Sequence, residues 1–122
     1  MATQDITAQQ FNEVISSNDI VIVDFWAEWC GPCKSFAPVY EKVSGNHDDI
    51  VFAKVDTEQE QELAGHFQIR SIPTLMIFRD QVVLFAQPGM LTEEQLEDVI
   101  SKVREVDMAK VHEEIANQES AS

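Results

Sequence analysis

The segment Asp24-Phe25-Trp26-Ala27-Glu28-Trp29-Cys30-Gly31-Pro32-Cys33-Lys34 joins two sequence patterns and contains both cysteines of the chain. Before it, residues 20–25 are apolar at nearly every position, which predicts a strand covered on both faces. After it, a helix should begin near Pro32 or Cys33 and end at about Val43, where Ser44-Gly45-Asn46 stops it. Both cysteines are therefore expected directly after a buried strand, at the start of a helix.

This position favours thiol chemistry. The first turn of a helix offers unpaired amides and the positive end of the helix dipole, and both stabilise a thiolate. Cys30, at the outer edge, is predicted to be the nucleophile, and Cys33, one turn further in, should be shielded yet able to reach the sulfur of Cys30. Asp24 is the candidate base for Cys33, because burial without a partner raises the pKa of a carboxyl group. Lys54, at the equivalent place on the next predicted strand, is its candidate ion-pair partner.

Two other uses of paired cysteines are disfavoured. Half of a zinc site would need two more ligands, but the chain has no second cysteine pair and its histidines, His47, His66 and His112, are scattered. A structural disulfide that closes so short a loop would constrain little of the unfolded chain. We therefore expect a redox-active pair and no bound metal.

The remaining elements extend outward from this segment. Three further strands are predicted over residues 51–55, 74–78 and 82–86, and the last two are too close in sequence for a crossover, so they should form an antiparallel hairpin. Capping-box patterns predict helix starts at Thr7, Thr57 and Thr92. Alternating helices and strands that end in a hairpin imply an α/β chain with a mixed central sheet and helices on both faces.

Two motifs carry a resemblance to a known family. Residues 24–34 resemble the active-site segment of thioredoxins almost residue for residue, and Ile69-Arg70-Ser71-Ile72-Pro73-Thr74-Leu75 resembles the family's second landmark, a cis proline that faces the dithiol. Gly89, before Met90, falls at the family's groove glycine. The resemblance covers roughly residues 6 to 104. It implies a thioredoxin fold, a three-layer α/β/α sandwich around a mixed sheet of four to five strands.

The resemblance also implies roles for individual residues. Cys30 would attack and Cys33 would resolve, with Asp24 and Lys54 as the buried pair beneath them and Pro73 facing them. The substrate groove would be lined by Trp29, Gly31, Pro32, Ile72, Gly89 and Met90. Electrons would come from NADPH through a thioredoxin reductase, so the chain itself would bind no cofactor. Its partners would be that reductase and proteins that carry disulfides.

The two ends of the chain depart from the family pattern. Only residues 1–5 are available for the family's first edge strand, which we expect to be short or missing. We expect a thioredoxin domain over residues 1–105, followed by an acidic, partly helical extension over residues 106–122. Val106, Met108, Val111 and Ile115 have some helical spacings, so the extension is either a dimer or docking surface or a solvated, fraying helix.

Charge and hydropathy indicate which partners and which cellular compartment to expect. The 122 residues carry a formal net charge of −14, which disfavours contact with nucleic acid or an anionic membrane surface. No apolar run approaches the roughly 20 residues that cross a bilayer, and residues 1–5 lack the pattern of a signal peptide. We therefore expect a cytoplasmic protein, monomeric as judged from its resemblance.

Three functions compete on the sequence. The first is a general protein-disulfide reductase, favoured by Gly31-Pro32 between the cysteines. The second is a reductase dedicated to one partner, which it would recognise through its tail or its acidic surface. The third is a non-catalytic binding or chaperone subunit. An oxidase or isomerase is disfavoured, because those relatives usually carry a histidine where this chain has Pro32.

Overall fold

The computed structural model describes residues 3–121, without the side chain of residue 121. It contains five strands and five helices in this part of the chain. In chain order they are β1 (Thr3–Asp5), α1 (Ala8–Ser17), β2 (Ile20–Trp26), α2 (Gly31–Ser44), β3 (Ile50–Asp56), α3 (Gln61–His66), β4 (Thr74–Arg79), β5 (Val82–Pro88), α4 (Glu93–Glu105) and α5 (Met108–Ala121).

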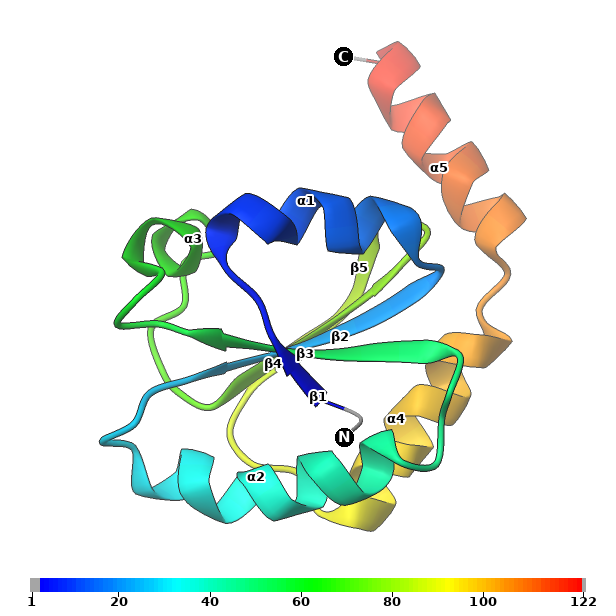
Figure 1. The fold of residues 1–122 in the computed structure, drawn as a ribbon. Helices are drawn as coiled ribbons and strands as arrows, with labels where there is room; N and C mark the ends of the chain where they lie inside the picture. Colours follow the sequence, from blue (N-terminus) through cyan, green and yellow to red (C-terminus); the bar gives the residue numbers. More distant parts are fainter. Residues whose placement is uncertain (1–2, 122) are drawn as a thin grey trace.

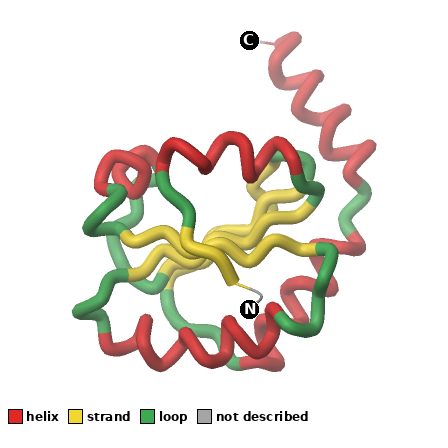
Figure 2. The backbone as a smooth tube through the Cα atoms, in the orientation of Figure 1, coloured by secondary structure: helices red, strands yellow, loops and turns green. Residues whose placement is uncertain are grey.

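The strands form one mixed sheet in the order β1-β3-β2-β4-β5. β1, β3 and β2 are parallel, whereas β4 is antiparallel to β2 and to β5. Helices α1 and α3 cover one face of the sheet, and α2 and α4 cover the other (Figures 1 and 2). The predicted three-layer α/β/α architecture and the terminal hairpin are both confirmed. The edge strand β1 is short, as expected.

The central strand β2 is buried at six of its seven positions because both of its faces are covered. Ile22 belongs to the core beneath α2 and α4, while Val21 and Val23 belong to the core beneath α1. Asp24 follows Ile22 by two residues and therefore faces the α2 side of the sheet. The same alternation places Trp26 on that side, at the end of β2 from which the chain enters the Cys30–Cys33 segment.

Two of the three predicted helix starts are correct. Thr92 caps α4, with its hydroxyl accepting from the Gln95 amide and the Gln95 side chain accepting from the Thr92 amide. The Gln10 side chain likewise accepts from the amide of Thr7 before α1.

The prediction at Thr57 is wrong, because α3 begins only at Gln61. The side chain of Asp56 accepts from the amides of Glu58 and Gln59, which stabilises a turn before the helix. The hydroxyl of Thr57 donates back to the carbonyl of Trp26 and is therefore not available as a helix cap.

The hairpin turn between β4 and β5 consists of Asp80 and Gln81, since Arg79 pairs with Val82. Both turn residues have positive φ angles, 51° and 67°. A tight two-residue turn of this hand requires that conformation at both positions, and glycine or asparagine adopt it at least cost.

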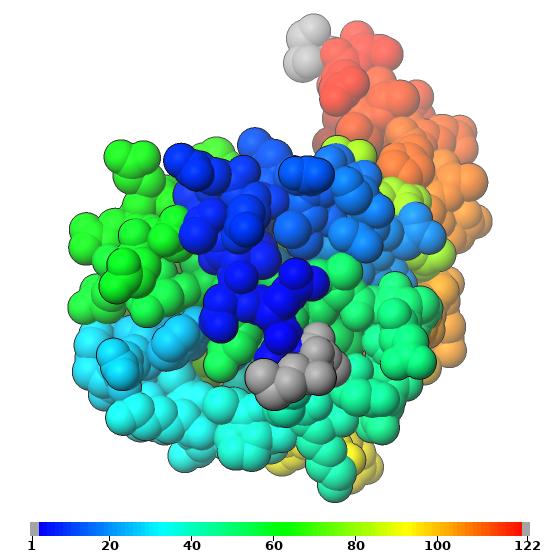
Figure 3. Space-filling view, in the orientation of Figure 1, coloured from blue at the N-terminus to red at the C-terminus, as the bar shows by residue number. Residues whose placement is uncertain are grey.

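The C-terminal segment forms a separate helix and does not continue α4. Val106 is extended, and the α4 carbonyls of Val103 and Arg104 and that of Val106 accept from the guanidinium of Arg79. Helix α5 then starts at Met108, which is buried, and projects from the body of the molecule (Figure 3). Within residues 3–121, no helix has the length and apolar character needed to cross a bilayer.

Candidate active site

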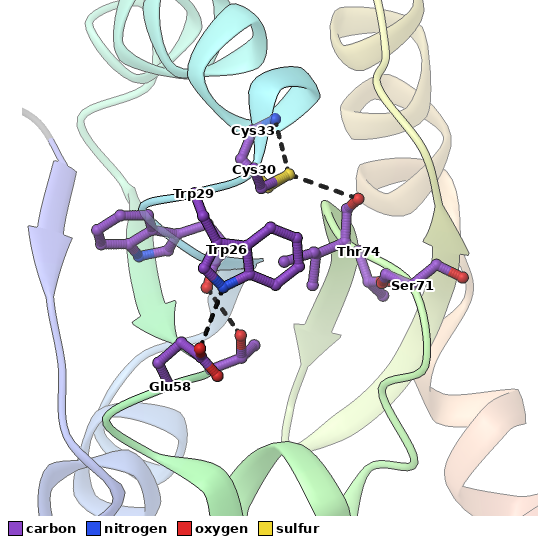
Figure 4. The surroundings of a disulfide bond; sticks show 9 residues. Trp26, Trp29, Cys30, Cys33, Glu58, Ser71 and Thr74 are labelled. Atoms are coloured by element: carbon purple, nitrogen blue, oxygen red, sulfur yellow. Dashed lines mark hydrogen bonds between the residues drawn. A yellow bond between two sulfur atoms is a disulfide. The ribbon is translucent and has the colours of Figure 1, made fainter.

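The two cysteines lie where β2 leads into α2, and they form a disulfide (Figure 4). Cys30 is the N-cap residue of α2, and Pro32 lies in the first turn, where the absence of an amide proton carries no cost. The backbone N–H of Cys33 donates to the sulfur of Cys30 at 3.2 Å. An amide of the first helical turn therefore points at the sulfur that the sequence predicts to be the nucleophile.

The expected difference in exposure between the two cysteines is nearly absent. Cys30 is 4% exposed and Cys33 is 3% exposed. The two sulfurs differ instead in their surroundings. The Cys30 sulfur accepts the Cys33 amide and lies 3.7 Å from the carbonyl oxygen of Ile72. It therefore adjoins the loop before β4.

Asp24 is buried on the same side of the sheet as α2 and is 1% exposed. Neither of its carboxylate oxygens has a hydrogen-bond partner among the described residues. Burial raises the pKa of Asp24 from 3.8 to about 7, an effect that the positive charge of Lys54 partly offsets. A carboxyl group with this pKa takes up and releases protons near neutral pH.

Lys54 pairs with Asp24 in the register of β2 and β3, as predicted. Its ammonium group, however, lies over the Trp26 ring, 4.9 Å from the ring centroid, and forms no hydrogen bond with the carboxylate in the described structure. The expected close ion pair is thus replaced by a cation–π contact. Lys54 still acts on Asp24 through its charge.

Pro73 follows a cis peptide bond, as the resemblance implied. Its carbonyl oxygen accepts the amide of Gly89 at 2.7 Å, which joins the loop before β4 to the segment after β5. Gly89 has a φ of 98°, a conformation that favours glycine, and the position thus has a local reason for this residue. The contact of Cys30 with Ile72 and the bond of Pro73 to Gly89 thus involve consecutive residues of the loop before β4.

The other predicted groove residues differ in their exposure to solvent. Trp29 is 69% exposed and Met90 is 45% exposed, so two large apolar side chains are presented to solvent. The Trp29 indole N–H donates to the carboxylate of Glu58 at 3.1 Å. Ile72 is half-buried, whereas Gly31 and Pro32 are exposed at the start of α2. Trp26, in contrast, is largely covered.

Sequence reasoning missed two polar residues around this site. Glu58, whose carboxylate accepts from the Trp29 indole, lies in the turn after β3, where the capping-box pattern at Thr57 predicts a helix. Tyr40 is fully buried in α2, and its hydroxyl lies 3.0 Å from the carbonyl oxygen of Ile22 and 2.7 Å from that of Ala53. Burial raises the pKa of Tyr40, and the nearby charge of Asp24 raises it further. Tyr40 follows Phe36 by four residues, a helical spacing that indicates a buried side chain. This spacing does not indicate the contacts of its hydroxyl with the two carbonyl oxygens.

No group of three or more His, Cys, Asp or Glu side chains within residues 3–121 is placed to hold a metal ion. The described site offers a dithiol–disulfide pair at a helix N-terminus, a buried carboxyl group and two exposed apolar side chains. These features fit thiol–disulfide exchange with another protein.

Comparisons with known proteins agree with this chemistry. The sequence model of the family described as Thioredoxin matches residues 2–102. A Streptomyces coelicolor protein called putative thioredoxin 2 is 52% identical over 119 residues, which is 98% of this chain and 89% of that protein. Bacillus subtilis thioredoxin is 38% identical and covers 84% of this chain and 98% of its own length.

Solved structures show the same likeness. Plasmodium falciparum thioredoxin superposes with a TM-score of 0.76 at 36% identity and covers 81% of this chain and 97% of its own. A mutant thioredoxin from Halobacterium salinarum gives 0.78 at 33% identity, with 85% and 92% covered. The chain therefore belongs to the thioredoxin family, and it is a thiol–disulfide oxidoreductase that reduces protein disulfides.

Proposed function

We propose that Cys30 is the attacking thiol of this reductase and Cys33 the resolving one. The thiolate of Cys30 attacks one sulfur of a substrate disulfide, so that a mixed disulfide forms and the other substrate sulfur leaves as a thiolate. The observation that carries this assignment is the Cys33 amide directed at the Cys30 sulfur at the N-terminus of α2. That amide and the helix dipole stabilise negative charge on Cys30.

In the second step, Cys33 attacks Cys30. The bond between Cys30 and the substrate breaks, the Cys30–Cys33 disulfide forms, and the second substrate sulfur leaves. Cys33 must first lose its proton, and we assign Asp24 as the group that receives it. A pKa of about 7 lets this carboxyl group accept a proton at neutral pH. Lys54 tunes it through charge.

The substrate groove is assigned to the residues around Pro73. Its carbonyl binds Gly89, while the preceding carbonyl, that of Ile72, faces the Cys30 sulfur. An extended substrate chain would lie across this loop. The exposed Trp29 and Met90 would contact its apolar side chains, and Gly31 and Pro32 would form the floor at the start of α2.

The cellular setting follows from the family. We assign NADPH as the electron source, delivered by a thioredoxin reductase that reduces the Cys30–Cys33 disulfide after each turnover. Proteins that carry disulfides are the other partners. We place the protein in the cytoplasm, where thiols are kept reduced. We also propose a monomer, with residues 1–105 as the catalytic domain and residues 106–122 as an extension.

Reduction of insulin driven by DTT tests this assignment. The protein should accelerate precipitation of the insulin B chain well above DTT alone, and Cys30→Ser should abolish the acceleration. Cys33→Ser is the matched control, because it retains the attacking thiol and should accumulate a mixed disulfide detectable by mass spectrometry. If Cys30→Ser instead accumulated the adduct, the two roles would be reversed.

A reductase dedicated to one partner is the second candidate, and the separate helix α5 is the observation that favours it. The truncation should keep Met108, which is buried, and the backbone of Val106, which accepts from Arg79. A chain that ends at Met108 should keep the insulin activity of a general reductase within about twofold. Loss of that activity would favour recognition through α5.

A further inference from the structure

The basic residues of this acidic chain are unequally paired. The sequence has 22 acidic and 8 basic residues, so most cations have an acidic group to bind. Arg104 binds Asp49, Lys42 binds Glu93 and Lys102 binds Asp98. Arg79 donates to three backbone carbonyls and Lys54 lies over Trp26.

Arg70 is different. It is exposed in the loop between α3 and β4, three residues before Pro73, and has no hydrogen bond or ion pair within the described part of the chain. Of the three arginines, it is the one whose guanidinium group binds no other group among residues 3–121. An unpaired arginine in a chain of net charge −14 leaves five donors free for an external acceptor.

Arg70 also lines a pocket of about 240 Å³ next to the cis-proline loop. The pocket lies between the end of that loop and β5, and it continues along Ser71 and Thr74 on one side and Pro88 on the other. Thr74 pairs with Pro88 across β4 and β5. Ile72 adjoins the disulfide, so the pocket begins one residue beyond the contact between the loop and Cys30.

The pocket wall is suited to an acid. Its floor is apolar, with Ile69, Met76 and Ala86, and no acidic residue is among those that line it. Gln68 also lines the pocket, and its side chain has no hydrogen-bond partner in the described residues. A carboxylate that entered would meet one cation and one side-chain amide donor, and no acidic residue lines the pocket to repel it.

An acidic residue lies elsewhere near the disulfide. Glu58 accepts from the indole N–H of Trp29, and Figure 4 shows Glu58 at that indole and Ser71 separately, on the loop beside Thr74. The carboxylate nearest to Trp29 is therefore not part of the Arg70 pocket.

We propose that the Arg70 pocket binds an aspartate or glutamate side chain of the substrate protein, a few residues from the cysteine that Cys30 attacks. The pocket therefore selects among disulfides by the charge beside them. This inference rests on the proposed groove and adds a substrate preference to it. An extended chain advances about 3.3 Å per residue, so positions two to four residues from the cysteine are the ones to test.

The probes are disulfide-linked dimers of a short synthetic peptide with one cysteine. Glu, Gln or Lys is placed two, three or four residues from the cysteine, on either side in turn. Pre-reduced protein, freed of DTT, is mixed with each dimer, and the released peptide thiol gives the second-order rate constant. At its best position the Glu peptide should react about two to five times faster than the Gln peptide, the range of an exposed ion pair.

Variants locate the origin of the preference. Arg70→Gln should remove the Glu preference and leave the rate for the Gln peptide unchanged, and Arg70→Glu should shift the preference to the Lys peptide. Lys34→Gln is the matched control, because it removes the same charge beside Cys33 without altering the pocket, so the Glu preference should persist. High salt should reduce the preference in the unmutated protein.

Each result has a definite meaning. Equal rates for the Glu and Gln peptides at every position would overturn the pocket assignment while leaving the reductase intact. The same conclusion would follow if Lys34→Gln erased the preference as fully as Arg70→Gln does. If the unmutated protein failed to reduce any of the peptides or insulin, the reductase assignment itself would fail, and the pocket assignment with it.

Discussion

The two ends of the parallel strands β2 and β3 handle charge in opposite ways. Near their carboxyl ends, before the Cys30–Cys33 segment, Asp24 is buried with no hydrogen-bond partner among the described residues. At their amino ends, Arg104 binds both carboxylate oxygens of Asp49, at 2.7 and 2.9 Å. His47 bridges this pair to Glu97, which also accepts from Asn46.

The comparison shows that one charged group lowers the stability of the fold while the other group of charges raises it. An unpaired buried carboxyl destabilises the fold whenever it is charged, and it persists where a proton must be moved. Paired surface charges add a little stability and perform no chemistry. The two ends should therefore respond to pH with opposite signs, and three substitutions test this contrast.

Asp24→Asn should give the largest effect. The pKa of Asp24 is about 7 in the folded protein against an ordinary value of 3.8. The folded state thus keeps a proton that the unfolded state releases, and stability falls as pH rises from about 4 to 7. Removing the charge should raise the free energy of unfolding by about 4 kcal/mol at pH 8 and by little at pH 4.

Urea unfolding of the oxidised protein at pH 4, 6 and 8 measures this difference. A gain of equal size at all three values would mean that Asp24 destabilises through its shape and not through its charge. In the reduced protein, the same variant should slow the second step of disulfide exchange while leaving the first attack largely intact. Equal rates for both steps would remove Asp24 from the mechanism.

Arg104→Gln tests the paired end and should act with the opposite sign. The hydrogen bond from Arg104 lowers the pKa of Asp49 from 3.8 to about 2. The unfolded state therefore binds the proton first, so the stability from this pair is present above about pH 4 and is lost as pH falls towards 2. The variant should lose roughly 0.5–1 kcal/mol at pH 7, because the pair is largely exposed.

The loss should shrink when urea unfolding is repeated at pH 3. Lys102→Gln is a suitable control, since Lys102 forms an exposed ion pair with Asp98 on the same helix. It should cost less than Arg104→Gln, because a single ammonium contact replaces the two parallel bonds of the guanidinium. An equal loss at pH 7 and pH 3 would show that Arg104 contributes through packing alone.

Elements set by local pattern were predictable from the sequence. The apolar run of β2 and the Thr-x-x-Gln pattern before α1 and α4 depend on neighbours in sequence, and each predicted its element within about a residue. The mixed sheet followed from the short connection between β4 and β5. The Cys30–Cys33 pair was placed correctly because strand and helix patterns meet there.

Features set by distant contacts were not predictable. The hydroxyl of Thr57 donates to the carbonyl of Trp26, 31 residues away in the sequence, and is therefore not available to cap a helix. The Lys54 ammonium group contacts the Trp26 ring and leaves Asp24 without a close ion pair. The sequence does not show which of these two residues on the same face of the sheet Lys54 contacts. The pocket at Arg70 exists only once β5 lies beside the cis-proline loop.

Gln81→Gly should give the smallest effect. It tests the backbone strain in the hairpin turn that lies at the same end of the sheet as the Arg104–Asp49 pair. Asp80 and Gln81 turn the chain there, and the Asp80 amide donates to the Asp19 carbonyl just before β2. A positive φ costs a residue with a side chain about 1–2 kcal/mol, and glycine avoids that cost but loses about 0.5–1 kcal/mol of chain entropy on folding. The net gain in the free energy of unfolding should be about 0.5 kcal/mol, measured by urea unfolding.

Because Gln81→Gly changes no charge, this gain should be the same at pH 4 and pH 8, unlike that of Asp24→Asn. A loss of stability would mean that the Gln81 side chain stabilises the turn by more than its backbone strain costs.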